Sequence, residues 1–183
     1  MLAGAVTKAP QQRRCSATPR YDRRVADAAA HEALIDRFYS AFARRDHETM
    51  AACYTQNPTF SDPVFRDLRG EEVRGMWRML CKRGLDLELT HSDVHAEGDR
   101  GSAHWVAEYT FSGTGRHVRN EIDASFRFED GLIAEHVDRF DLWRWTRQAL
   151  GPVGLLAGWS PPVQNKVRGQ ARENLRDFMA ASD

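Results

Sequence analysis

The sequence predicts an α+β domain in which a curled antiparallel sheet covers three N-terminal helices. The first observation is the order of the elements: apolar residues recur at helical spacing in 31–83, and polar and apolar residues then alternate in 85–140. The second is a hairpin, in which the alternating stretch 120–128 runs into Asp130-Gly131 before the chain returns. Both turn residues tolerate the positive φ angles that a tight hairpin requires.

Three helices are expected before the sheet, each with an apolar stripe that can face a core. They span residues 31–45, 47–54 and 71–83. Asp46 can cap the second helix, and Gly84 suits the C-cap of the third. Residues 59–64 between these two helices read as a short extended piece, because Pro63 disfavours the helical conformation at Asp62.

Residues 116–145 carry the best candidates for chemistry. On the first strand of the hairpin, one face is formed by Asn120, Ile122, Ala124, Phe126 and Phe128. On the return strand, 132–140, His136 and Asp138 share a face with apolar residues such as Phe140. A polar pair therefore lies among apolar neighbours, next to the face that carries the asparagine.

The two ends of the chain are expected to lie outside a domain that spans 31–151. Residues 1–30 are rich in arginine, lack the periodicity of a packed element and resemble a disordered basic tail. Their scarcity of acidic residues is also compatible with a transit peptide. Residues 152–183 are expected to form a loop and a helix that pack on the domain, with Pro161 and Pro162 opening the helix.

The loop of this extension is strongly apolar. Leu155, Leu156 and Trp159 are too apolar to be left in water. We therefore expect them to cover either the mouth of a cavity or a partner subunit.

Charge and composition exclude several classes of protein. Residues 1–30 hold six basic and two acidic residues, a charge of +4, so the remainder carries −4 and the formal net charge is zero. A body that binds nucleic acid is normally basic, so we expect no nucleic-acid partner. No apolar run approaches the roughly 18 residues of a membrane span, and we expect no membrane partner either. The three cysteines show no paired spacing, which favours a reducing, cytoplasmic location over a disulfide framework.

Four segments, in this order, resemble the nuclear transport factor 2-like superfamily, specifically its polyketide-cyclase-like (SnoaL-like) branch. They are residues 38–46, 60–64 (Phe-Ser-Asp-Pro-Val), 126–133 and 135–141. The superfamily includes ketosteroid isomerases, limonene-epoxide hydrolases, cyclases and non-enzymatic binding modules. The resemblance implies a cone-shaped sheet that is hollow at its wide end, an apolar small-molecule ligand and a homodimer formed through the outward face of the sheet. We expect that face to bear Val118, Asp123, Arg127 and Val137.

Matched residue by residue, the resemblance gives an incomplete isomerase site. Asp62 matches the general base of the ketosteroid isomerases. The isomerase's oxyanion tyrosine falls at Phe38, although Tyr39 is adjacent, and its second oxyanion donor falls at Ala124. Asp62 could therefore be a base whose pKa is raised by burial. Alternatively, it caps a turn before Pro63.

The epoxide hydrolases are matched only in part. Asp138 resembles their water-activating aspartate, but Glu121 stands where their arginine should be. Asp138 and His136 could orient a water or relay a proton, because histidine titrates close to neutral pH. Alternatively, the two side chains bond only to each other or to the backbone at the rim of the sheet. The candidate catalytic residues are thus Asp62, Asp138 and His136.

Aromatic and amide side chains are candidates for the walls of a cavity. The candidate substrate-binding residues are Tyr39, Trp77, Trp105, Tyr109, Asn120 and Phe140. Aromatic walls with few polar groups suit a flat, mostly apolar ligand. The alternative is that these rings fill a solid core and that Asn120 bonds to the neighbouring strand. Neither His-Glu-x-x-His nor Cys-x-x-Cys occurs in the sequence, and we expect neither a metal nor another cofactor.

The sequence thus predicts a small-molecule-binding domain with an apolar cavity. If it is an enzyme, it is a cofactor-free acid–base isomerase, cyclase or hydrolase. Because neither known site is complete, the competing hypothesis is a non-catalytic ligand-binding or dimerisation module. A cavity lined by both Asp62 and Asp138 favours the first hypothesis.

Overall fold

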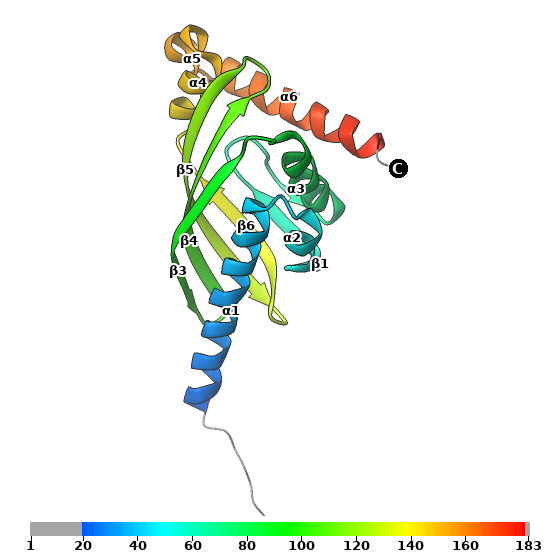
Figure 1. Ribbon diagram of the computed structural model, residues 1–183, viewed down its shortest axis with the longest axis vertical. Coiled ribbons are helices and arrows are strands. Elements are labelled where there is room, and N and C mark those ends of the chain that lie inside the picture. The colour runs from blue at the N-terminus through cyan, green and yellow to red at the C-terminus, as the bar shows by residue number, and fades with distance from the viewer. Residues whose placement is uncertain (1–19, 182–183) are drawn as a thin grey trace, which may run out of the picture.

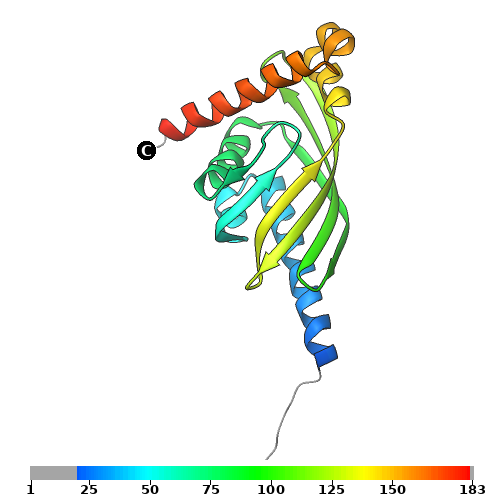
Figure 2. The same ribbon diagram turned by 180° about the vertical axis from the view of Figure 1, so that it is seen from behind.

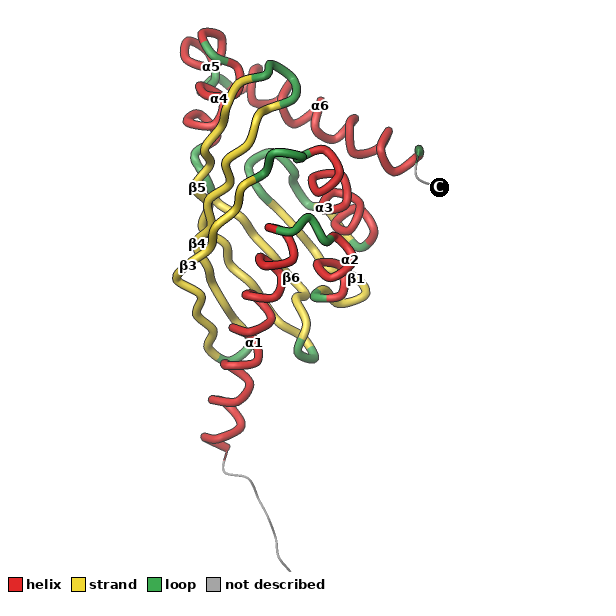
Figure 3. The backbone as a smooth tube through the Cα atoms, viewed as in Figure 1, coloured by secondary structure: helices red, strands yellow, loops and turns green. Residues whose placement is uncertain are grey.

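The computed structural model describes residues 20–181, with side chains from residue 27 onward. The described part forms a curved six-stranded sheet with helices over its concave side and at one end (Figure 1). In chain order the elements are α1 (Arg20–Ala43), α2 (His47–Ala52), β1 (Tyr54–Ser61), β2 (Leu68–Arg69), α3 (Glu71–Arg83), β3 (Glu88–Glu97), β4 (Arg100–Phe111), β5 (Arg116–Glu129), β6 (Leu132–Arg139), α4 (Leu142–Leu150), α5 (Pro152–Ala157) and α6 (Pro161–Ala180). Figure 3 distinguishes the strands of the curved sheet, in yellow, from the helices, in red.

The first helix is longer than the sequence pattern indicates. α1 begins at Arg20, so the predicted boundary of the tail at residue 30 is wrong. Residues 20–30 are rich in alanine and arginine, which favour helix, but they carry no apolar stripe. Figure 1 shows the start of α1 projecting beyond the sheet, where there is no core for a stripe to contact. Residues 1–19, including Cys15, lie outside the described residues.

The sheet is mixed, with strand order β2-β1-β6-β5-β4-β3. The meander from β3 to β6 is antiparallel, as predicted. β1, however, pairs with β6 in parallel, with Phe60 opposite His136, so the expectation of a fully antiparallel sheet is wrong. The chain passes through α3 and the whole meander between these two strands, and a connection of that length allows a parallel neighbour.

The β5–β6 hairpin is confirmed. Asp130 and Gly131 have φ angles of 51° and 75°, as the two central residues of a type I′ turn require. The resulting register sets Ala124 opposite Asp138 and Phe126 opposite His136. The two polar side chains therefore face the concave side of the sheet.

The core lies between this concave face and helices α1 to α3. Phe38 of α1 is fully buried near its centre, and its ring makes edge contacts with the rings of Tyr39, Tyr54, Trp77 and His136. Burying an aromatic side chain of this size contributes roughly 1.5–3 kcal/mol to stability. Cys53 and Cys81 are free thiols buried in the same core.

Helix α4 covers a second, smaller apolar cluster. Asp141 caps this helix by accepting hydrogen bonds from the backbone N–H groups of Trp143 and Arg144. Val118 is fully buried in the cluster, so its predicted place on the outward face is wrong. Side chains on a strand alternate between its two faces, and Val118 lies an even number of residues from the buried Ile122 on β5. The two side chains therefore share one face of the sheet.

Residues 151–162 contain helix α5, where an irregular loop was expected. Glycines allow α5 to pack closely on α4. A Cβ on Gly154 would lie 1.8 Å from the backbone oxygen of Thr146, and a Cβ on Gly158 would lie 2.0 Å from the hydroxyl of Thr146. Leu155 and Leu156 do not cover the cavity mouth, because their side chains are 55% and 77% exposed, and the alternative that they cover a partner subunit stays a prediction.

Helix α6 packs on α3, as Figure 2 shows from behind. Leu175 is buried in the main core, and Gly75 of α3 leaves room for the side chain of Met179. Arg168 and Arg172 of α6 also donate hydrogen bonds to backbone oxygens of the loop that follows β1. No helix within residues 20–181 is long and apolar enough to cross a bilayer.

Candidate functional site

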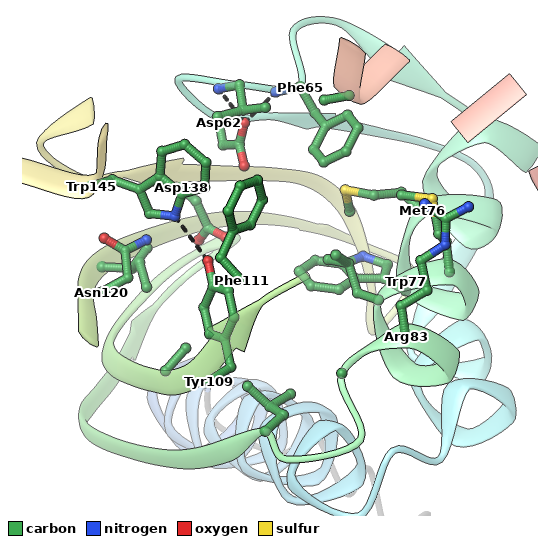
Figure 4. Close-up of a pocket in the computed structure, with 18 of the residues that line it drawn as sticks. Asp62, Phe65, Met76, Trp77, Arg83, Tyr109, Phe111, Asn120, Asp138 and Trp145 are labelled. Atoms are coloured by element: carbon green, nitrogen blue, oxygen red, sulfur yellow. Dashed lines mark hydrogen bonds between the residues drawn. The ribbon is translucent and has the colours of Figure 1, made fainter. Parts of the chain in front are cut away.

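A cavity of about 250 Å³ lies between α3, the concave face of the sheet, α4 and α6. Most of its wall is apolar, and the wall includes Phe60, Met76, Trp77, Trp105, Ile122 and Phe140. Among the polar residues, Asp62, Tyr109, Asn120 and Asp138 also line it (Figure 4). The volume lies just below the usual range for small-molecule pockets, so the cavity suits a compact ligand.

The cavity brings together most of the residues that the sequence singles out. Those that line it are Asp62, Trp77, Trp105, Tyr109, Asn120, Asp138 and Phe140. His136 lies behind the wall, and Tyr39 is fully buried between α1 and the sheet. Tyr39 does not line this cavity, because its ring stacks on His91 and contacts Trp105 in the packed part of the core.

Asp62 directly follows strand β1 and holds the turn that comes next. Its Oδ1 accepts hydrogen bonds from the backbone N–H groups of Val64, at 2.6 Å, and Phe65. This is the turn-capping role, and it occupies one carboxyl oxygen. The carboxyl group points into the cavity (Figure 4). Burial, reinforced by the charge of Asp138, raises its pKa to about 7, although the two backbone bonds act in the opposite direction.

Asp138 lies at the end of a chain of buried hydrogen bonds. Its Oδ1 accepts from Nε1 of Trp105 at 3.3 Å and lies 3.0 Å from Nε2 of His136. Nδ1 of His136 lies 2.7 Å from the hydroxyl of Tyr54, which accepts from Nε1 of Trp77 at 3.0 Å. No hydrogen bond from a residue within 27–181 reaches Oδ2 of Asp138, so that oxygen remains for the cavity.

The Tyr54 hydroxyl connects the two ends of this chain. It accepts from Nε1 of Trp77, and burial raises its pKa well above the ordinary value, so the hydroxyl keeps its proton. That proton can be donated to Nδ1 of His136, whose Nε2 faces Oδ1 of Asp138.

Tyr109 and Asn120 add two further polar groups to the lining of the cavity. The hydroxyl of Tyr109, on β4, accepts a hydrogen bond from Nε1 of Trp145 at 2.8 Å. Burial raises the pKa of Tyr109, so the hydroxyl keeps its proton and can donate it to a ligand. Asn120 lies on the adjacent strand β5, and its amide makes no hydrogen bond to a residue within 27–181. Its amide is therefore free to contact a ligand in the cavity.

Trp145 and Tyr54 are site residues that sequence reasoning missed. The spacing of Leu142, Trp145 and Ala149 indicates one face of a helix, but it does not tell which part of the sheet that face contacts. Tyr54 was expected at the end of a helix, whereas it begins strand β1. Its position beside His136 follows from the parallel pairing of β1 with β6.

Residues 27–181 contain no group of three histidine, cysteine, aspartate or glutamate side chains arranged to hold a metal ion.

Comparison with known proteins agrees with this architecture. The family described as SnoaL-like domain matches residues 35–136, more than half of the chain. The fold is similar to that of an LEH-like epoxide hydrolase from M. tuberculosis, with a TM-score of 0.57, 18% identity, and coverage of 72% of this chain and 96% of that one. It is also similar to TsrD from Streptomyces laurentii, with a TM-score of 0.56, 28% identity, and coverage of 66% and 95%.

A third similar structure is that of a protein assigned to the SnoaL-like polyketide cyclases from Jannaschia Sp. CCS1 (TM-score 0.60, 16% identity, coverage of 68% of this chain and 94% of that one). No curated protein sequence matches the chain. Together, the family match and the shared fold lead to one conclusion. The chain belongs to the SnoaL-like domain family of the nuclear transport factor 2-like superfamily.

Proposed function

We propose that this protein is an acid–base enzyme that moves a proton on a compact, mostly apolar molecule carrying a carbonyl group. One observation carries the proposal: a carboxyl group with a pKa of about 7, Asp62, shares an apolar cavity with a hydroxyl donor, Tyr109. A base is most effective when its pKa lies near the working pH. The assignment of relatives as polyketide cyclases and epoxide hydrolases is compatible with chemistry of this kind.

The proposed step transfers a proton from carbon to Asp62. The ionised carboxylate removes a proton from the carbon next to the carbonyl, and the electron pair of that C–H bond moves to the carbonyl oxygen to give an enolate. Tyr109 donates its hydroxyl proton in a hydrogen bond to this oxygen, and Asn120 can donate an amide proton. Protonated Asp62 then delivers the proton to another carbon of a conjugated enolate, which completes an isomerisation, whereas return to the original carbon gives hydrogen exchange alone. Positioned donors of this kind lower the energy of the charge that develops.

Asp138 has a supporting part in this proposal. Its negative charge keeps the pKa of Asp62 high, because two neighbouring carboxylates cannot both ionise easily. His136 and Tyr54 are positioning residues, since they hold the carboxylate of Asp138 in place without reaching the cavity.

The test compares Asp62→Asn with Asp67→Asn. The asparagine at position 62 keeps the oxygen that accepts the two turn bonds, so the fold is retained while the base is lost. Asp67 is an exposed residue of the same loop with a φ angle of 56°, which asparagine tolerates, and it serves as the control for the same change of charge.

The measurement is the exchange of α-hydrogens of compact apolar ketones in D₂O, followed by NMR. We expect the wild type and the Asp67 variant to exchange hydrogen equally, and the Asp62 variant to be slower by roughly 10²–10⁴-fold. Equal exchange in all three proteins would refute the assignment of Asp62 as the base.

The competing function is a non-catalytic ligand-binding module. The observation in its favour is that Asp62 has a complete structural role in its turn. Native mass spectrometry of the purified protein identifies any molecule retained in the cavity. A retained molecule that neither exchanges hydrogen nor changes covalently in the wild type would favour the binding module.

A further inference from the structure

The tip formed by α5 and the residue after its C-terminal glycine exposes an unusual amount of apolar surface. Val153, Leu155, Leu156 and Trp159 are 62%, 55%, 77% and 64% exposed. Figure 1 shows α4 and α5 at one end of the long axis of the molecule. The four side chains therefore lie on a protruding end, separate from the cavity, and we call them the apolar tip.

Close packing of α5 on α4 forces these side chains outward. The inner side of α5 is glycine, because Gly154 and Gly158 lie against Thr146 with no room for a Cβ. A helix in a soluble domain normally turns its apolar side chains toward the core. Here the arrangement is reversed, so the exposure of the leucines is built into the contact between the two helices.

Basic side chains lie on one side of the apolar tip. A shallow groove beside it is lined by Arg116, His117, Arg144 and Arg147 together with Leu155. Arg144 forms an ion pair with Glu121, and Nε2 of His117 lies 3.8 Å from Glu108.

Two of these arginines keep an unneutralised charge. Arg116 donates to the backbone oxygen of Gln148, and the guanidinium of Arg147 lies over the ring of Trp143, with centroid and Cζ 4.6 Å apart. Residues 142–172 include no acidic residue; their charged residues are Arg144, Arg147, Lys166, Arg168 and Arg172.

We propose that the apolar tip docks on the surface of a bilayer that contains anionic lipids. Leucine side chains at the tip enter the boundary between headgroups and acyl chains, and Trp159 occupies the interface, where tryptophan is favoured. Arg116 and Arg147 contact the lipid phosphates. We choose an anionic bilayer by charge complementarity, since basic side chains next to exposed apolar side chains match a surface with negative headgroups and an apolar interior.

A second copy of the chain fits the tip less well. A twofold symmetric contact through the tip would bring the same arginines of both subunits together, and like charges repel across an interface. Three side chains on a six-residue helix and one tryptophan after it also supply little area compared with the roughly 1,200–2,000 Å² that a stable interface buries. The expectation of no membrane partner rests on the lack of a spanning segment in the sequence. A surface contact requires no such segment.

The experiment is co-sedimentation of the full chain with vesicles of phosphatidylcholine, with and without about one third phosphatidylglycerol. The replacement of Leu155 and Leu156 by serine removes the apolar contact, and Leu85→Ser, at a 76% exposed leucine far from the tip in sequence, is the matched control. Replacement of Arg116 and Arg147 by glutamate reverses the charge of the basic side chains beside the tip. Replacement of Arg69 and Arg176, two exposed arginines elsewhere, by glutamate is the charge control. Thermal unfolding checks that each variant is folded.

We expect the wild type and both controls to bind the anionic vesicles and to bind neutral vesicles at least tenfold more weakly. The leucine and arginine variants should each lose tenfold or more in partitioning to the anionic vesicles. Binding should shift tryptophan fluorescence to shorter wavelength, and Trp159→Phe should remove most of that shift.

Three results would overturn the proposal. The first is that the wild type does not bind anionic vesicles, and the second is that the leucine variant binds as the wild type does. The third is a dimer in light scattering that the leucine replacements dissociate, which would assign the tip to a second copy. None of these results bears on hydrogen exchange at Asp62, so this inference and the proposed function stand or fall separately.

Discussion

The indole N–H of Trp145, on α4, donates a hydrogen bond of 2.8 Å to the hydroxyl of Tyr109, on β4. This bond connects a helix that follows the matched SnoaL-like region to the polar wall of the cavity. It also lowers the pKa of Tyr109, against the opposing effect of burial. The C-terminal part of the chain therefore helps to determine how well Tyr109 can donate to a ligand.

We predict that Trp145→Phe weakens catalysis more than stability. The phenyl ring preserves the apolar contact but removes the N–H that polarises the hydroxyl of Tyr109. A hydrogen bond of this kind is worth roughly 1 kcal/mol, so kcat/KM should fall by about fivefold. Steady-state kinetics on an identified substrate, with urea denaturation in parallel, measures both effects. An unchanged kcat/KM would mean that Tyr109 does not depend on Trp145.

Stability should fall as pH rises through the titration of Asp62. Its pKa is about 3.9 in an unfolded chain and about 7 in the folded protein, so folding takes up a proton between pH 4 and pH 7. The contribution of Asp62 is therefore neutral below pH 4, becomes steadily more unfavourable between pH 4 and pH 7, and stays at its full unfavourable value above pH 7. Asp62→Asn should match the wild type in stability at pH 4 and be more stable by on the order of 2 kcal/mol at pH 8. This figure is smaller than the full pKa difference implies, because solvent screens part of the charge on Asp62. Thermal unfolding across pH, with Asp67→Asn as the control, tests this difference.

The two buried tyrosines should respond oppositely to loss of their hydroxyl groups. Tyr54→Phe leaves the N–H of Trp77 and Nδ1 of His136 without partners and should cost about 1–3 kcal/mol. Tyr39→Phe removes a buried hydroxyl that has no hydrogen-bond partner among the described residues, so it should be neutral or stabilising. Chemical denaturation of both variants is the measurement. Equal destabilisation would contradict the hydrogen-bond chain.

Helix α6 should be necessary for both stability and the cavity. Leu175 is 2% exposed, so Leu175→Ala should destabilise the protein by about 2–4 kcal/mol. Ala171 and Asn174 of the same helix line the cavity, so ligand affinity should fall as well. Leu85→Ala, at an exposed position, should change stability by less than about 0.5 kcal/mol. Urea titration of the two variants separates the packing effect from a general effect of shortening a leucine.

The residues that share a face of the hairpin could be predicted from the sequence, because side chains alternate with a period of two. This period alone sets His136 and Asp138 on the buried side, and Asp130-Gly131 defines where the strand turns. The same rule, applied correctly, also assigns Val118 to that side.

Features that depend on contacts between distant segments could not be predicted in this way. The parallel pairing of β1 with β6, which brings Tyr54 to His136, depends on the path of the chain through the intervening elements. The outward direction of Leu155 and Leu156 depends on the close packing of Gly154 against Thr146. The local pattern of apolar residues does not predict this contact. The part of Trp145 in the site likewise depends on where α4 contacts the sheet.

The hydrogen bond of 2.9 Å from Arg168 to the backbone oxygen of Pro63 joins α6 to the residue that follows Asp62. Any displacement of α6 that widens the entrance to the cavity would therefore pull on the turn that holds this carboxyl group. Entry of a ligand and the orientation of Asp62 would then be coupled. The carboxyl group would reach its final orientation only after α6 had moved back over the bound ligand.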